Sequence, residues 1–231
     1  MTRHSGQAGN SARIQMQGGF ETRPYQIPAF AGKTDEIISD KQVRNERKNP
    51  LTWAQLNYWT KEGIEMEAAA VKAVVEGLKQ AGVDFISLLP DSDFSDLQHQ
   101  VASDKHFTYV PVSNEAIGVG VCAGAYLSGK RPALLVPTSG LLVAAWPLTS
   151  ICMAWGLPLL LLIPYRGDIG DAFWLMGPYK DTTEPLLKVL NAPYSVISKH
   201  EEISKAIIDA QGSTISWQRP VAVLLTGETI K

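Results

Sequence analysis

Beyond residue 63, the sequence alternates between segments in which apolar residues recur every three or four positions and short runs of consecutive apolar residues. In the first such segment, residues 64–82, one helical face carries Ile64, Ala68, Val71, Val75 and Leu78. Gly82 can end this helix. The run that follows, VDFISLLP (83–90), has the length and composition of a buried strand. The pattern therefore predicts a helix followed by a strand.

The same alternation continues to the C-terminus. Further apolar runs predict strands at 107–112, 132–137, 157–164, 194–198 and 220–227. The segments between them predict a short helix through Leu97 and Val101 and longer helices at 112–130, 140–155, 182–190 and 201–217. At 182–190, Thr182 or Thr183 is the expected N-cap, with Pro185 in the first turn. Together these elements predict an α/β fold, a six-stranded parallel sheet with helices on both faces.

Residues 132–165 contain no charged side chain, and this length would permit a membrane span. Prolines cut the stretch into pieces of strand or helix length at Pro137, Pro147, Pro158 and Pro164. Buried strands of a parallel sheet are continuous apolar runs. We therefore expect these residues to form a soluble core and not to cross a membrane.

The first 50 residues differ from the rest, because they are polar, glycine-rich or charged and lack a sustained apolar stripe. Two interpretations are open: a flexible tail, or an arm that wraps a partner subunit. The apolar anchors of such an arm would be Phe20, Tyr25, Ile27 and Phe30. The expected organisation is an N-terminal extension, residues 1–50, and one domain, residues 51–231.

Composition narrows the class of function. The 231 residues are 45% hydrophobic and 19% charged, an ordinary globular balance, and the formal net charge is -2 without a basic stripe. Nucleic acid is therefore not an expected partner. Cys122 and Cys152 lie in apolar segments without metal-site or disulfide spacing, and the N-terminus lacks a secretory pattern. A reducing cytoplasm is the expected location.

Ligands of parallel α/β sheets bind at the carboxyl ends of the strands. The expected ends carry PDSD (90–93), VSNE (112–115), PTSG (137–140) and PYRGD (164–168). Asp91 and Ser92 either face a substrate or cap a helix. Arg166 either holds an anionic group or pairs with Asp168.

Glu115 begins an otherwise uncharged helix that contains Gly118, Gly120 and Gly124. One interpretation is that Glu115 complements the helix dipole. However, each glycine in a helix interior costs about 1 kcal/mol relative to alanine, so three of them suggest close approach by another backbone or a flat ligand. A carboxylate beside such a contact would be partly desolvated and suited to sharing a proton with a ring nitrogen.

The segment VPVSNEAIGVGVCAGAYLSGKRPALLVPTSGL, followed by LPLLLLIPYRGD, resembles the pyrimidine-binding domain of thiamine-diphosphate-dependent decarboxylases. Within that group it is similar to sulfopyruvate decarboxylase alpha subunits and to phosphonopyruvate decarboxylases. The likeness extends from about Ile64 to Leu225. It rests on PDS, NEA-G-G--AGA-L--GK, SGL, LTS and RGD-G, which occur in the family's order and spacing.

The resemblance implies a function for Glu115. The matching glutamate of the family hydrogen-bonds the aminopyrimidine ring of thiamine diphosphate and promotes the proton transfer that activates the cofactor, which then serves as an electron sink for decarboxylation of a 2-oxo acid. The resemblance also implies cofactor contacts by Thr138, Ser139, Gly140 and Gly118. PTSG stands where the family usually has Gln-Asn-Ser-Gly, so Ser139 and Gly140 match while both amides are absent.

The other half of the expected cofactor site is missing from the sequence. In the family, a second domain with a Gly-Asp-Gly opening and a later asparagine holds the diphosphate and Mg²⁺. The segment GDIGDAF with Asn191 has too short a spacing, so we expect no metal ligand in this chain. The resemblance therefore implies a beta subunit that carries the diphosphate site, and an alpha/beta hetero-oligomer.

Alternative functions stay open at this point. They are a thiamine-diphosphate-dependent carboligase subunit, a non-catalytic regulatory subunit that keeps the fold, and a generic nucleotide-binding domain, although no complete glycine fingerprint follows a strand. The segment DAFWLMGPY, with Phe173, Trp174 and Tyr179, fits core packing, a cover over the active site or a partner interface.

Overall fold

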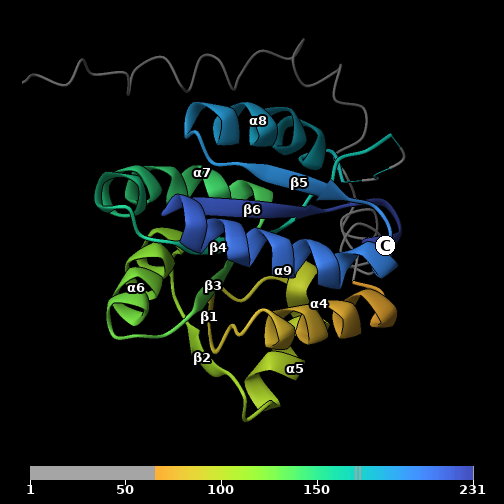
Figure 1. Ribbon diagram of the computed structural model, residues 1–231. Coiled ribbons are helices and arrows are strands. Elements are labelled where there is room, and N and C mark those ends of the chain that lie inside the picture. The colour runs from red at the N-terminus through yellow and green to blue at the C-terminus, as the bar shows by residue number, and fades with distance from the viewer. Residues whose placement is uncertain (1–65, 170, 172, 231) are drawn as a thin grey trace, which may run out of the picture. The chain divides into compact units, whose positions relative to one another are not determined.

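A computed structural model describes residues 66–169, 171 and 173–230. Their strands form one parallel sheet in the order β2-β1-β3-β4-β6-β5 (Figure 1). The strands are β1 (Phe85–Leu88), β2 (Thr108–Pro111), β3 (Pro132–Leu135), β4 (Leu159–Pro164), β5 (Tyr194–Ile197) and β6 (Pro220–Leu225). Every residue of β1, β3, β4 and β6 is buried, which explains why these strands appear in the sequence as unbroken apolar runs.

Helices cover both faces of the sheet. On one face, α4 (Ala68–Gln80), α5 (Ser95–Ser103) and α9 (His200–Trp217) contribute to one apolar cluster with the strands. On the other, α6 (Glu115–Leu127), α7 (Thr138–Pro147), a π-helical segment (Leu148–Met153) and α8 (Met176–Val189) contribute to a second cluster. The predicted fold class is confirmed.

The predicted helix at 64–82 is present as α4, but its buried face is shifted. Val71 and Leu78 are buried as expected, whereas Ala68 is exposed and Val75 is half-buried. Ile64 lies outside the described residues, as does the proposed boundary at residue 50. In the described part of the chain, no helix is both long and apolar enough to span a membrane.

The predicted start of α8 is wrong. The helix begins at Met176, so Thr182 and Thr183 are interior residues, and both hydroxyls donate to the Tyr179 carbonyl instead of capping the helix. This helix start could not be predicted from the sequence, because Gly177 and Pro178 are residue types typical of a loop. A proline in the first turn costs a helix little, because its missing N–H would have no intrahelical partner there.

The helix expected at 140–155 also differs from the prediction. It starts two residues earlier, at Thr138, and changes to π-helical hydrogen bonding after Pro147. Proline cannot donate the backbone hydrogen bond that an α-helix needs at this position, and π-helical turns are a common way to accommodate such a break. The early start places Thr138, Ser139 and Gly140 in the first turn of α7.

Candidate active site

The carboxyl ends of four neighbouring strands carry most of the predicted site residues. Because the strand order runs β2-β1-β3-β4, the segments that follow these strands lie side by side along one edge of the sheet. Glu115 follows β2, Asp91 and Ser92 follow β1, and Thr138–Gly140 follow β3. Arg166 follows β4. The fold therefore brings together segments up to 75 residues apart, from Asp91 to Arg166.

Glu115 is the first residue of α6. Asn114 has an extended backbone, and its side-chain oxygen accepts a hydrogen bond from the Ala116 N–H at 2.8 Å, as an N-cap residue does. This cap fixes where the helix starts and therefore where the Glu115 side chain leaves the backbone. The position is also favourable for a carboxylate because of the helix dipole.

The helix dipole alone does not account for the burial of Glu115. Its side chain is buried, with the residue only 6% exposed, and it forms no hydrogen bond or ion pair with any other described residue. Burying a polar group without a partner is unfavourable, and first-turn acids that serve only the dipole can stay in water. A carboxylate in this situation is suited to bind a group from outside the chain.

Gly140 lies directly against the Glu115 carboxylate. A Cβ atom at Gly140 would lie 2.3 Å from Oε1 of Glu115 and 2.7 Å from its Cδ, so any side chain here would displace the carboxylate. Gly140 belongs to the first turn of α7, where backbone N–H groups lack intrahelical partners. The amino ends of α6 and α7 therefore meet at this carboxylate.

Two hydroxyl groups lie in the same turn of α7. Thr138 is buried and Ser139 is half-buried, and neither hydroxyl forms a hydrogen bond with a described residue. Both can donate or accept a hydrogen bond. The structure thus brings Thr138, Ser139 and Gly140 together with Glu115; their contact with a cofactor stays a prediction.

The three glycines of α6 have different surroundings. Gly118 packs the helix on the sheet, because a Cβ there would lie 2.8 Å from a methyl group of Leu134. At Gly120 and Gly124, by contrast, no described atom lies within 4 Å of an added Cβ. Close approach within the described chain therefore explains Gly118 alone, and a cofactor contact by Gly118 stays a prediction.

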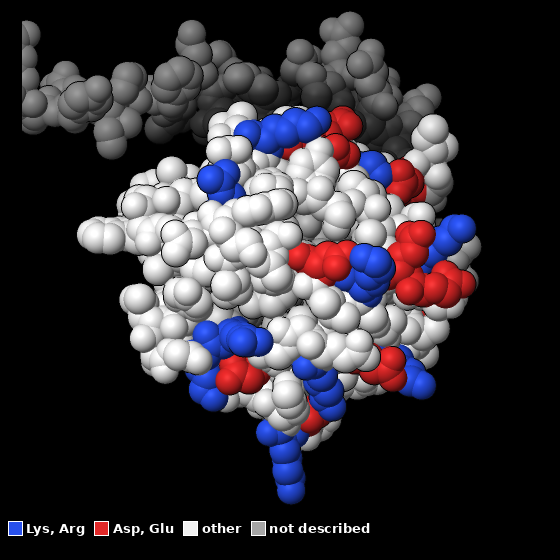
Figure 2. Space-filling view, viewed as in Figure 1, with Lys and Arg blue, Asp and Glu red and all other residues white. Residues whose placement is uncertain are grey.

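The outer surface of α6 and α7 is apolar. In Figure 2, the surface over α7, at the left, carries no charged side chain. Large apolar side chains are exposed on α6 at Ile117 and Leu127, on α7 at Leu142, Val143 and Trp146, and just beyond the π-helical segment at Trp155. Large apolar side chains exposed on neighbouring helices are typical of an interface with another protein chain.

Arg166 does not pair with Asp168, so that alternative is wrong. Its Nη1 donates to Asp93 Oδ1 at 2.9 Å, while Nη2 and Nε donate to the two carboxylate oxygens of Asp171 at 3.0 and 3.2 Å. Asp168 instead bonds Lys180 and accepts from the Thr226 hydroxyl at 2.7 Å. The sequence could not indicate that Asp93 and Asp171 are the partners, because the pairing depends on which loops are neighbours.

This Arg166–Asp93–Asp171 triplet is almost entirely buried, with side chains only 9–10% exposed. Backbone N–H groups of Gly167 and Phe173 also donate to Asp171, at 3.1 and 3.0 Å. Burial raises the pKa of Asp93, Arg166 opposes that rise, and Asp91 and Asp171 add to it. The triplet joins the loop after β1 to the loop after β4, on either side of β3.

Asp91 serves as a helix cap. Its side chain accepts from the Asp93 N–H at 2.9 Å and begins the short 3-10 helix Ser92–Phe94. Ser92 is exposed. The capping alternative is therefore observed for Asp91, and a substrate contact by Asp91 or Ser92 stays a prediction.

The aromatic residues after Asp171 are not part of the core. Phe173 is 36% exposed and Trp174 73% exposed, and their rings meet edge to face with centroids 6.4 Å apart.

Among the described residues, no group of three His, Cys, Asp or Glu side chains lies close enough to hold a metal ion. Asn191 lies just after α8 with a left-handed backbone, away from the carboxyl ends of the strands.

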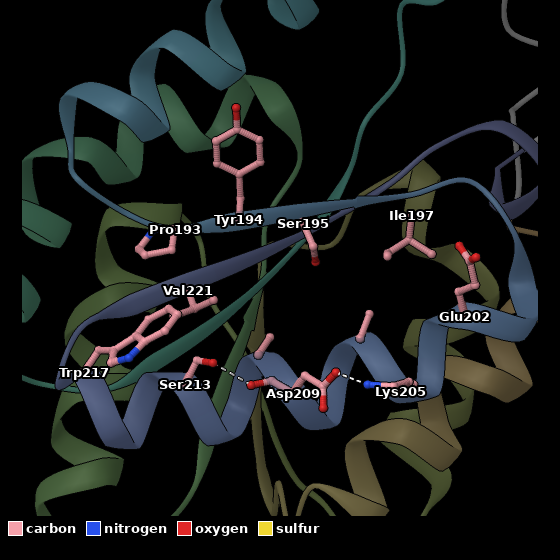
Figure 3. A pocket seen from close by; sticks show the side chains of 12 residues that line it. Pro193, Tyr194, Ser195, Ile197, Glu202, Lys205, Asp209, Ser213, Trp217 and Val221 are labelled. Carbon is pink, nitrogen blue, oxygen red and sulfur yellow. Dashed lines mark hydrogen bonds and ion pairs between the residues drawn. The ribbon is translucent and has the colours of Figure 1, made fainter.

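A groove of about 420 Å³ in the described part of the chain lies away from Glu115. It lies between α9 and the edge strand β5, and Figure 3 shows Ser195 and Ile197 pointing into it while Tyr194 points to the opposite face. Its charged lining residues are Glu202, Lys205 and Asp209, and the last two bond each other. The groove contains none of the predicted site residues.

Comparisons with known proteins agree with this fold. No protein-family model matches the chain. The chain is 33% identical over 156 residues to the sulfopyruvate decarboxylase subunit alpha of Methanococcus maripaludis, covering 68% of this chain and 93% of that subunit. It is 29% identical over 140 residues to the sulfopyruvate decarboxylase of Methanosarcina acetivorans, covering 59% of this chain but only 36% of that protein.

A solved structure shares the fold. The Mycobacterium smegmatis protein, described as a thiamin diphosphate-dependent enzyme, superposes with a TM-score of 0.56 at 20% sequence identity. The superposition covers 68% of this chain and 30% of that chain.

Proposed function

Because the chain belongs to the sulfopyruvate decarboxylase alpha-subunit family, we propose that it is the pyrimidine-binding subunit of a two-chain, thiamine-diphosphate-dependent 2-oxo acid decarboxylase. One observation carries this proposal above the others. Glu115 is a buried carboxylate without a described partner, it sits at the amino ends of two helices, and Gly140 leaves it room.

The residues present fit the pyrimidine end of thiamine diphosphate. Glu115 would hold a ring nitrogen through a hydrogen bond and exchange a proton with it. Thr138 and Ser139 would offer hydroxyl hydrogen bonds beside it, and Gly140 would keep the carboxylate in place. When bound, the cofactor supplies the electron sink that a decarboxylation requires.

A second chain would supply the rest of the site. The relative from Methanococcus maripaludis is named as subunit alpha, and the chain matches nearly all of it but only about a third of the Methanosarcina protein. These lengths support a partner, the proposed beta subunit, that binds the diphosphate and Mg²⁺.

The proposed location is the cytoplasm. Both cysteines are free thiols in buried positions. Burial raises the pKa of Cys152 to about 12, which leaves this thiol protonated and unreactive near neutral pH. Such thiols are compatible with a reducing compartment.

The experiment that tests the function uses the complex purified with its partner. Glu115→Gln should lower kcat for decarboxylation by about 100-fold or more, because a carboxamide cannot exchange the proton. Glu202→Gln is the matched control, since Glu202 is also a first-turn acid but is exposed, on α9. If Glu115→Gln kept the wild-type kcat, the proposed function of Glu115 would be wrong.

Calorimetric titration of thiamine diphosphate into the same complex provides a second measurement. Wild-type complex should bind the cofactor, and Glu115→Gln should weaken that binding because one hydrogen bond to the ring changes. A complex that binds no thiamine diphosphate would contradict both a decarboxylase and a carboligase. It would leave the non-catalytic subunit as the better interpretation.

A further inference from the structure

Strand β5 forms one edge of the sheet and directs backbone hydrogen-bonding groups outward. It pairs with β6 on one side, and no strand in the described part of the chain pairs with its other side (Figure 1). The Pro193 and Ile197 carbonyls accept hydrogen bonds from the side of β6, at 2.9 Å each. Because successive residues of a strand direct their backbone groups to opposite edges, Tyr194 and Val196 direct theirs away from the sheet.

The opposite edge strand, β2, is less suited to pairing. The N–H groups of Thr108 and Val112 donate toward β1, at 2.8 and 3.0 Å, so the outward residues of β2 are Tyr109 and Pro111. Proline has no N–H, and its presence on an edge strand discourages pairing with another chain. Strand β5 contains neither proline nor a charged residue, and Val196 is 45% exposed. Of the two edges of the described sheet, β5 is therefore the better template for another strand.

The groove beside β5 brings two opposite charges close to this edge. Ser195 points from β5 toward the part of α9 that carries Asp209, and Lys205 lies one helical turn before Asp209 (Figure 3). Both side chains are exposed. If a second α9 ran antiparallel beside the first, Lys205 of each copy would face Asp209 of the other. The charges along this groove are thus complementary to those of a second copy.

The backbone of β5 is complementary to a second copy in the same way. In an antiparallel pair of strands, residues that exchange both N–H···O=C bonds alternate with residues that exchange none. If Ser195 faces Ser195 of a second copy across a two-fold axis, Tyr194 of each copy faces Val196 of the other. Those are the residues whose backbone groups point outward, so both pairs can exchange their hydrogen bonds.

We propose that two copies of this chain associate through β5, which joins their sheets into one and sets their α9 helices antiparallel on the same face. Such a two-fold, self-complementary contact is the commonest kind of interface between identical chains. The inference does not rest on the function proposed for Glu115, because β5 carries none of the predicted site residues. The test therefore uses the full chain without a partner subunit.

A cysteine substitution tests the register of the pairing. The two Ser195 residues would form a non-hydrogen-bonded pair with Cα atoms about 4.5 Å apart, a distance that a disulfide can span. Under mild oxidation, the Ser195→Cys chain should run as a dimer on a non-reducing gel. Cys122 and Cys152 are buried and should not compete. Val196→Cys is the control, because the two Val196 residues would be diagonal neighbours roughly 7–8 Å apart, too far for a disulfide.

Val196→Pro tests the contribution of the backbone hydrogen bonds. The Val196 N–H points away from β6, so proline should cost the described sheet no hydrogen bond while it removes a donor from the proposed interface. We expect the dissociation constant of the dimer, measured by sedimentation equilibrium, to rise by about tenfold or more. Val196→Thr is the matched control, because threonine keeps the N–H and favours a strand, and it should leave the dissociation constant close to that of wild type.

The results separate this interface from other arrangements. A wild-type chain that sediments as a monomer overturns the inference. So does a dimer that forms no Ser195→Cys cross-link and keeps its affinity in Val196→Pro, because that dimer uses another surface. Equal cross-linking of Ser195→Cys and Val196→Cys would indicate random collisions and also overturn it. If circular dichroism shows that Val196→Pro does not fold, the two cysteine variants decide the question.

Discussion

Glu115 and Gly140 form the contact on which the site depends. They lie on different helices, α6 and α7, and touch because both helices begin at the carboxyl edge of the sheet. The sequence motifs indicated each residue separately, through the family resemblance. Their direct contact could not be predicted, because it depends on how the two helix starts are positioned in space.

Gly140→Ala tests this contact. The new methyl group would overlap the Glu115 carboxylate, which is the flexible end of a side chain and can swing away. We therefore expect little loss of stability but a decrease in kcat of about 100-fold, because the carboxylate is displaced by more than about 1 Å. Activity assays on the two-chain complex, together with urea unfolding, would measure both effects.

Gly212→Ala is the matched control for that substitution. Gly212 lies inside α9, and no described atom is within 4 Å of an added Cβ. Replacing an unconstrained helix glycine should raise the free energy of unfolding by about 1 kcal/mol and leave kcat unchanged. Loss of activity in both variants would contradict a specific role for Gly140.

The Arg166–Asp93–Asp171 triplet acts at the scale of loops. It fastens the segment after β1 to the segment after β4, across the end of β3. Asp171→Ala would leave the buried guanidinium with one partner, so we expect the free energy of unfolding to fall by about 3 kcal/mol. Asp168→Ala, in the same loop, removes a carboxylate whose side chain is 60% exposed and should cost less than about 1 kcal/mol.

Chemical denaturation of both variants measures these effects. Equal losses for Asp171→Ala and Asp168→Ala would indicate that burial of the triplet contributes little to stability. The larger loss for Asp171→Ala would support its part in holding the loops beside the candidate site.

A second polar cluster fastens α8 to the sheet. Glu184 on α8 accepts hydrogen bonds from the hydroxyls of Tyr194, at 2.6 Å, and Tyr165, at 2.8 Å. These bonds hold the pKa of Glu184 below its usual value, with Tyr194 the larger contributor. The carboxylate is ionised in the folded chain at pH values where it begins to protonate in the unfolded chain.

This pKa shift predicts a pH dependence. A lowered pKa in the folded state adds stability above the unfolded pKa, about 4.3, and that contribution disappears as the pH falls through the folded pKa. Urea unfolding at pH 3 to 7 should therefore show wild type more stable than Glu184→Gln at pH 6, with the difference shrinking below about pH 4. A difference that grew on acidification would contradict stabilisation of the ionised carboxylate by the two tyrosine hydroxyls.

At the element scale, the strands were predicted best. Buried parallel strands leave unbroken apolar runs such as LPLLLLIP, and each predicted run contains an observed strand. Helix boundaries were predicted less well, because the start of α8 at Met176 and the π-helical turn after Pro147 depend on local backbone bonding, not on apolar spacing. The partners of Arg166 were missed because Asp93 is distant in sequence.

At the scale of the whole molecule, the family resemblance inferred from the motifs is confirmed by the identity to sulfopyruvate decarboxylase alpha subunits. The exposure of apolar side chains on α6 and α7 was not predicted from the sequence. An uncharged segment such as 132–165 predicts burial, but it does not indicate whether the same chain or another chain covers it. We expect the proposed beta subunit to cover part of this surface.

Trp146→Glu tests this expectation. Trp146 is 75% exposed on α7, so the substitution should not disturb the core, but a charge there should lower co-purification of the partner by about tenfold or more. Trp217→Glu is the control, since Trp217 is 52% exposed on α9, beside the groove in Figure 3. Unchanged partner recovery with Trp146→Glu would exclude this part of α7 from the interface.

The absence of a side chain at Gly140 also has an evolutionary consequence. No other amino acid can occupy this position while the Glu115 carboxylate keeps its present location, since even a methyl group would overlap Oε1. Aspartate, which is one methylene shorter, would free that space, but it would also withdraw the carboxylate from its present location. We therefore expect related sequences to keep Gly140 and Glu115 together, so that a protein without the glycine also lacks the glutamate.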